Sequence, residues 1–173
     1  MNPAREVRLR PVIDADLPVL FEHQRDPAAA RMAATTALSR GEHAEMWQSL
    51  HADPGALGRT IVVDDVVAGA LTSWERWDQR QVGYCLGREY WGRGIATTAL
   101  ALFLGQMTIR PVHAYVAAHN LASRRVLDKC GFRPGGTGTG GTAGDSEGAL
   151  LGYVLGITLA ERIGPVPRPP AAR

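Results

Sequence analysis

A turn with two glycines holds the residues best suited to bind an anion. Residues 91–94, Trp-Gly-Arg-Gly, follow an apolar run that ends at Leu86 and precede a helical pattern that begins near Gly94. Glycines allow a ligand to approach the backbone closely, and the first N–H groups of a helix have no acceptor within it. The helix dipole and the Arg93 side chain add positive potential. The sequence therefore predicts a phosphate-binding turn.

Two common phosphate-binding motifs do not fit this turn. A dinucleotide-binding turn has a third glycine and an acidic residue about 20 positions further on. Here the third glycine position is Thr97, and residues 90–127 contain no Asp or Glu. A P-loop is excluded as well, because no glycine is followed by Lys and then Ser or Thr. A glycine turn before a helix also occurs as a simple tight connection, so the turn alone does not define the ligand.

The turn and a second segment together resemble the GNAT superfamily of acyl-CoA-dependent N-acetyltransferases. Residues 91–96 resemble motif A, usually written Q/R-x-x-G-x-G/A, with Trp in place of the first Gln or Arg. Residues 120–132 resemble motif B through Asn120, Ser123 and the pair Gly131 and Phe132. The run 90–97, Tyr-Trp-Gly-Arg-Gly-Ile-Ala-Thr, is similar to the Rim-type branch, the N-terminal acetyltransferases of ribosomal proteins and their relatives. Two motifs in the family's order make the resemblance specific.

The resemblance implies where acetyl-CoA would lie. The strand before the turn and the strand after the helix splay apart in this family, and the pantetheine arm lies between them. Backbone groups from Tyr84 to Gly87 would then bind its amides, and an N–H near Leu86 would polarise the thioester carbonyl. Asn120 would bond the pantetheine arm, and it also suits a plain helix cap. The residues that would hold the pyrophosphate are Trp91, Gly92, Arg93, Gly94, Ile95 and Ala96, with Thr97 in the first helical turn.

Acetyl transfer also requires a neutral amine and a proton for the leaving thiolate. The ordinary pKa is about 10.4 for a lysine-like ammonium group and about 8.5 for a thiol. Gln81 stands where many relatives carry a strand Glu, and Leu127 stands where many carry a tyrosine acid. Rim-type members use a serine in this region, so Ser123 is the candidate acid. Glu75 is the candidate base, followed by a water molecule and then Asp78. Each carboxylate suits an ordinary hairpin surface better than a catalytic role.

Short strands and helices alternate in an order that predicts a mixed α/β domain of GNAT type. Strands are expected at 5–12, 59–63, 66–73, 81–86, 112–116 and 149–155, with another beginning at Phe132. Helices are expected at 16–25, 41–50, 94–107 and 120–130, the second with a capping box at Ser39 and Glu42. The prediction is a central mixed, mostly antiparallel, splayed sheet of about six to seven strands flanked by about four helices.

The chain of 173 residues, 45% of them hydrophobic, suits a single domain at 1–160 followed by a proline-rich tail at 161–173. Pro27 is expected to end the first helix, and 31–38 is either an acceptor loop or a surface connection. The glycine-rich segment 135–148 is expected to be a loop. The resemblance implies that this loop overhangs the acceptor site.

Composition excludes several classes of partner. A formal net charge of +2 and scattered arginines predict no nucleic-acid or acidic-membrane partner. No apolar run approaches the ~18 residues of a membrane span, and the N-terminus lacks a secretory signal, which predicts a cytoplasmic protein. Cys85 and Cys130 are expected to be reduced thiols. The five histidines lack metal-ligand spacing, so no metal is expected.

These features predict an acetyl-CoA-dependent N-acetyltransferase. The acceptor would be a primary amine, either a protein or peptide N-terminus or a small amine, that attacks directly in a ternary complex. The alternative is a non-catalytic acyl-CoA-binding or sensing module, which the residues at Gln81 and Leu127 favour because neither can transfer the proton. The expected partners are acetyl-CoA and the amine, and the expected state is a monomer or homodimer.

Overall fold

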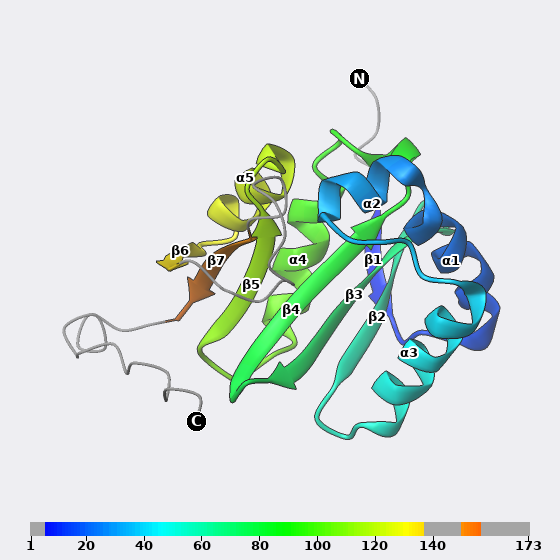
Figure 1. Ribbon diagram of the computed structural model, residues 1–173, viewed down its shortest axis with the longest axis horizontal. Coiled ribbons are helices and arrows are strands. Elements are labelled where there is room, and N and C mark those ends of the chain that lie inside the picture. Colours follow the sequence, from blue (N-terminus) through cyan, green and yellow to red (C-terminus); the bar gives the residue numbers. More distant parts are fainter. Residues whose placement is uncertain (1–5, 137–149, 157–173) are drawn as a thin grey trace, which may run out of the picture.

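A seven-stranded sheet in the order β1-β2-β3-β4-β5-β7-β6 crosses the molecule (Figure 1). The computed structural model describes residues 6–136 and 150–156. The expected loop at 135–148 lies almost entirely outside these residues, and the tail at 161–173 lies wholly outside them. The strands are β1 (Val7–Arg10), β2 (Leu57–Val63), β3 (Val66–Arg76), β4 (Gln79–Leu86), β5 (Val112–Ala117), β6 (Arg133–Gly136) and β7 (Leu150–Leu155).

The sheet is open between its two central strands. All neighbouring strands are antiparallel except β4 and β5, which run parallel and pair only through Arg80 with Val112 and Gln81 with His113. Beyond Gln81 the two strands diverge, as Figure 1 shows. Residues 82–86 of β4 therefore have a strand partner on the β3 side alone. The predicted mixed, mostly antiparallel, splayed sheet is confirmed.

Helices cover both faces of the sheet. On one face lie α1 (Leu17–Arg25), α2 (Pro27–Ala33) and α3 (Arg40–Ala52), and on the other lie α4 (Ile95–Gly105) and α5 (Leu121–Lys129). Short 3-10 turns, η1 (Asp14–Asp16) and η2 (Arg88–Tyr90), precede α1 and the glycine turn. The main core lies between the sheet and α4, whose Ala99, Leu100 and Phe103 are fully buried. Within the described ranges, no helix is both long and apolar enough to span a membrane.

The segment after α1 differs from the prediction. Helix α1 ends at Arg25, but Pro27 starts a new helix instead of a connection, so the expected loop at 31–38 is helical as far as Ala33. The cause is local, because the Asp26 carboxylate accepts a 2.7 Å hydrogen bond from the Ala28 N–H, and proline fits the first helical position. Helix α2 therefore stands beside the open part of the sheet.

Both early hairpins form through tight turns. Asp64 and Asp65 have φ values of 48° and 66°, as the favoured two-residue hairpin turn requires. The second turn is tighter than predicted, because β3 continues through Arg76 and only Trp77 and Asp78, with φ of 53° and 54°, join it to β4. The capping box of α3 forms as predicted between Ser39 and Glu42.

Candidate functional site

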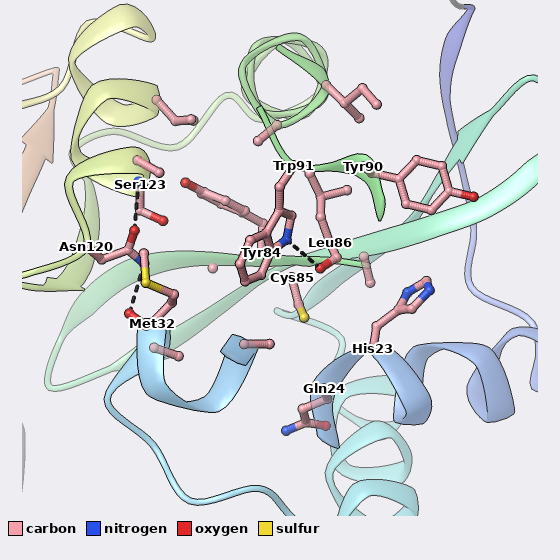
Figure 2. Close-up of a pocket in the computed structure, with 18 of the residues that line it drawn as sticks. His23, Gln24, Met32, Tyr84, Cys85, Leu86, Tyr90, Trp91, Asn120 and Ser123 are labelled. Atoms are coloured by element: carbon pink, nitrogen blue, oxygen red, sulfur yellow. Dashed lines mark hydrogen bonds between the residues drawn. The ribbon is translucent and has the colours of Figure 1, made fainter. Parts of the chain in front are cut away.

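A cavity of about 710 Å³ occupies the opening beside β4. Its lining comes from both helical layers, with α4, α5 and the glycine turn on one side and α1, α2 and α3 on the other. Figure 2 shows Tyr84 and Ser123 toward the α5 side of β4, and His23, Gln24 and Cys85 on the opposite side. We call these the donor half and the acceptor half of the cavity. A volume of this size suits a small-molecule or cofactor site.

The glycine turn has the open backbone that an anion site needs. Gly92 and Gly94 have φ values of 70° and 77°, which a side chain would disfavour, and no heavy atom lies within 4 Å of either Cβ position. Helix α4 begins at Ile95, so the first N–H groups of the helix have no acceptor within it. Of the expected turn residues, Trp91, Gly92, Gly94, Ile95, Ala96 and Thr97 line the cavity, whereas Arg93 is exposed and does not.

The backbone of β4 points donors into the opening. The Gly87 N–H donates a 2.9 Å hydrogen bond to the Ala68 carbonyl on the β3 side. Because backbone groups alternate along a strand, the N–H groups of Leu86 and Tyr84 point to the other side, where β5 has diverged. The Leu86 carbonyl accepts a 3.0 Å hydrogen bond from the Trp91 indole. This bond fixes the Leu86 backbone beside the turn, with its N–H directed into the opening.

Tyr84 places a buried hydroxyl close to α5. Figure 2 shows this hydroxyl pointing toward Ser123. The hydroxyl makes no hydrogen bond within the described part of the chain. Burial raises the pKa of Tyr84 to about 12, and the nearby Ser123 hydroxyl opposes the rise although the two groups fall short of hydrogen-bond geometry. Tyr84 is therefore a neutral phenol, and both side chains line the cavity.

Asn120 lies where the two halves of the cavity meet. As predicted, it caps α5, because its side-chain oxygen accepts a 3.0 Å hydrogen bond from the Ser123 N–H. Its amide nitrogen donates a 2.9 Å hydrogen bond to the Met32 carbonyl in α2. Asn120 thus lines the cavity with its oxygen and one of its N–H groups already bonded to the protein.

The structure does not bring the expected carboxylate bases to the cavity. Glu75 is exposed on β3, where its side chain forms a 3.2 Å ion pair with Arg80, and Asp78 lies in the adjoining turn. Neither residue lines the cavity, and neither does Gln81, which is 4% exposed. Glu75 is far along β3 because the strand continues past Ser73, which the sequence pattern did not show.

Several lining residues of the acceptor half were missed from the sequence. His23 lies one helical turn after buried Leu20, and this spacing was the signal that could have placed it inward. Burial lowers the pKa of His23 despite the Glu89 carboxylate, whose oxygen lies 3.7 Å from its Nε2 atom. His43 accepts a 3.1 Å hydrogen bond from the Trp47 indole, and burial and then Arg40 lower the pKa of His43. Both imidazoles are therefore neutral near pH 7.

Cys85 lines the cavity as a protonated thiol. Burial, with a smaller contribution from Asp26, raises the pKa of the Cys85 thiol to about 11, so this lining group is not a thiolate. Cys85 and Cys130 are both free cysteines. Within residues 6–136 and 150–156, no group of three His, Cys, Asp or Glu side chains is placed to hold a metal ion.

Comparisons with known proteins agree with this architecture. The structure of spermidine N-acetyltransferase from Vibrio cholerae in complex with CoA and spermine gives a TM-score of 0.74, with 14% identity over 86% of this chain and 94% of that chain. An aminoglycoside acetyltransferase in complex with coenzyme A gives 0.72, with 18% identity over 91% and 99%. A GNAT-family acetyltransferase from Bacillus anthracis gives 0.71, with 16% identity over 88% and 95%.

Sequence comparison identifies the family directly. A search of curated protein sequences gave no significant match. Residues 6–133, which include both motifs and all the described residues that line the cavity, match the family described as Acetyltransferase (GNAT) domain. The chain therefore belongs to the GNAT family of acetyltransferases.

Proposed function

We propose that this GNAT N-acetyltransferase moves the acetyl group of acetyl-CoA to a primary amine by direct attack, with both molecules bound in the cavity at once. The observation that carries the proposal is the course of the cavity, which passes from the glycine turn through the open part of the sheet to α1, α2 and α3. A donor and an acceptor entering from opposite faces would meet beside β4. The neighbours bound to CoA and to spermine support this arrangement.

The donor half supplies the groups that acetyl-CoA would need. The N–H groups at the start of α4 and the helix dipole would bind the pyrophosphate. The N–H groups of Tyr84 and Leu86 would bind pantetheine in place of the missing strand partner. The Leu86 N–H would also stabilise negative charge on the thioester oxygen, which is the oxyanion-hole role. Acetyl-CoA supplies the activated acyl group, and these residues orient it.

Proton transfer is assigned to Ser123 and to water. Ser123 lines the cavity next to the neutral Tyr84 hydroxyl, so Ser123 would pass its proton to the leaving thiolate and take a proton from solvent in return, with Tyr84 supporting it. With Glu75 outside the cavity, water becomes the acceptor of the amine proton. The likeness of residues 90–97 to the Rim-type branch leaves a protein or peptide N-terminus as one possible acceptor and a small amine as the other.

The test is a thermal-shift titration with acetyl-CoA, CoA and NAD, followed by an assay of amine-dependent thiol release. A ligand at 100 times its dissociation constant stabilises the folded state by about 2.7 kcal/mol, so both CoA species should raise the melting temperature and NAD should not. Thiol release that depends on an amine supports transfer. Binding of both CoA species with only slow hydrolysis would instead establish an acyl-CoA sensor, and no shift would remove the assigned donor site.

A further inference from the structure

As far as the structure describes it, the acceptor half of the cavity is mostly apolar and is lined by no carboxylate, and we infer that it selects a primary amine with a single charge and a compact apolar or aromatic group. This inference rests on the proposed function and specifies its substrate class. It separates the chain from two of its structural neighbours. One was solved with bound spermine, and the name of the other specifies an aminoglycoside. Both of those ligands carry several ammonium groups.

Apolar side chains from α1, α2, α3 and the sheet line the acceptor half. Leu20, Met32 and Met46 contribute from the helices. Trp74 of β3 lies over Gly83 of β4, because a Cβ atom at Gly83 would come within 3.3 Å of the Trp74 ring. Gly83 thus makes room for the Trp74 indole, which provides a flat aromatic surface there. Such a surface favours an aliphatic or aromatic substituent.

The charge of the lining argues against a polycation. Among the residues that the structure describes, no Asp or Glu lines the cavity. The titratable side chains of the acceptor half, His23, His43 and Cys85, are all uncharged near pH 7, since burial lowers the pKa of the two imidazoles and raises that of the thiol. The charged lining residues, Arg125 and Lys129, come from α5 in the donor half and are cationic.

A single ammonium and several ammonium groups behave differently in such a space. Desolvation disfavours the charged form of an amine and lowers its pKa, so the one ammonium that must lose its proton is helped to do so. This effect compensates for the lack of a carboxylate base in the cavity. Gln81 is not a base, and the Glu75 carboxylate lies outside the cavity. Additional ammonium groups would be desolvated with no carboxylate to pair with among the described residues that line the cavity, which is costly. The same lining that activates a monoamine therefore excludes a polyamine.

Size adds a second restriction. The cavity of about 710 Å³ must accommodate the pantetheine arm as well as the acceptor. The hydrogen bond from Asn120 to Met32 closes one side of the acceptor half with α2. The remaining space suits a small amine or the first residue of a peptide. Both would present a primary amine next to one apolar or aromatic group.

The experiment compares initial rates of thiol release from acetyl-CoA with five acceptors. They are 2-phenylethylamine, tryptamine, a phenylalanyl tripeptide amide, spermidine and kanamycin. We expect kcat/KM for at least one of the first three to exceed that for spermidine and kanamycin by about tenfold or more. A higher value for the peptide than for the free amines supports the inference and assigns the source to a chain terminus. Equal or faster reaction of spermidine or kanamycin overturns it.

A matched pair of variants tests the charge argument. Met46→Glu adds a carboxylate to the acceptor half, and Met46→Gln adds a neutral group of the same size. Met46→Glu should move the ratio of kcat/KM values toward spermidine by about tenfold relative to Met46→Gln. An unchanged ratio in two folded variants overturns the inference. If no amine of either class reacts while acetyl-CoA still raises the melting temperature, the proposed function itself fails, and the inference fails with it.

Discussion

The Asn120 amide nitrogen donates a 2.9 Å hydrogen bond to the backbone carbonyl of Met32, 88 positions earlier in the chain. Next to it, His119 Nε2 lies 2.8 Å from the Arg31 carbonyl oxygen and is therefore the donor. These carbonyls belong to the last turn of α2, where a helix leaves its acceptors unsatisfied. The segment between β5 and α5 thus adds two hydrogen bonds to those that the Ala34 and Thr35 N–H groups already make at the C-terminal end of α2, and it holds α2 across the open part of the sheet.

Asn120→Asp separates the two bonds of this side chain. The carboxylate keeps the cap on α5, because it still accepts from the Ser123 N–H, but it cannot donate to Met32. We expect a loss of about 1–2 kcal/mol in the free energy of unfolding. Urea denaturation measures this loss, and Asn120→Ala, which removes both bonds, should lose more. A variant as stable as the wild type would show that the Met32 bond contributes nothing.

Gly94→Glu should abolish CoA binding while the domain stays folded. The new carboxylate would stand at the N-terminus of α4, where the open backbone would otherwise receive phosphate. Isothermal titration calorimetry with CoA measures the effect. Gly94→Ala controls for the strain of a positive φ, and Gly105→Glu places the same charge at the other end of α4, where no atom lies within 4 Å. Retained binding in Gly94→Glu would refute the phosphate site.

The proton-transfer roles predict opposite results for two substitutions. Ser123→Ala should lower kcat by about tenfold or more with little change in CoA affinity, because the thiolate loses its proton donor. Glu75→Gln should leave kcat within about twofold, because the Glu75 carboxylate lies outside the cavity, where it pairs with Arg80. Steady-state kinetics with a saturating amine checks both. A large loss in Glu75→Gln would restore the carboxylate as a base.

Tyr84 predicts a loss of stability in alkaline solution. Its pKa is raised from 10 in the unfolded chain to about 12 by burial, so folding favours the neutral phenol. That contribution is complete below pH 10 and is lost as the pH rises through 12, by about 2–3 kcal/mol. Tyr84→Phe should lack this part of the loss, which urea denaturation at pH 9 to 11 would reveal. Cys85 is retained in both proteins, so its own titration cancels in the comparison.

His23 predicts the opposite behaviour in acid. Burial lowers its pKa below the ordinary value of 6.5, so the stability from its neutral form is present above that pH and is lost as the pH falls through the folded pKa. His23→Gln should therefore be less sensitive than the wild type between pH 7 and 5. Thermal unfolding across this range measures the difference. His51→Gln, an exposed histidine on α3, is the control, and equal acid sensitivity in all three proteins would contradict the assignment.

Local signals were sufficient for the elements that carry the donor half. The glycines of the turn, the Asn120 cap and the capping box at Ser39 each act within a few residues, so their structure could be predicted from the sequence. The acceptor half could not be, because it depends on how α1, α2 and β3 meet across the sheet. Glu75 illustrates why. The sequence placed the end of its strand at Ser73, but β3 keeps pairing with β4 through Glu75 and Arg76, and this longer pairing decides where the Glu75 carboxylate lies.

The open part of the sheet has a consequence for self-association. An unpaired strand edge is normally a template on which another chain can add, and outer edges must be protected against aggregation. In this chain the unpaired stretch of β4 lies in the middle of the sheet, between α2 on one face and α5 on the other. A foreign strand cannot approach it sideways, whereas a thin, flexible ligand can enter from either face.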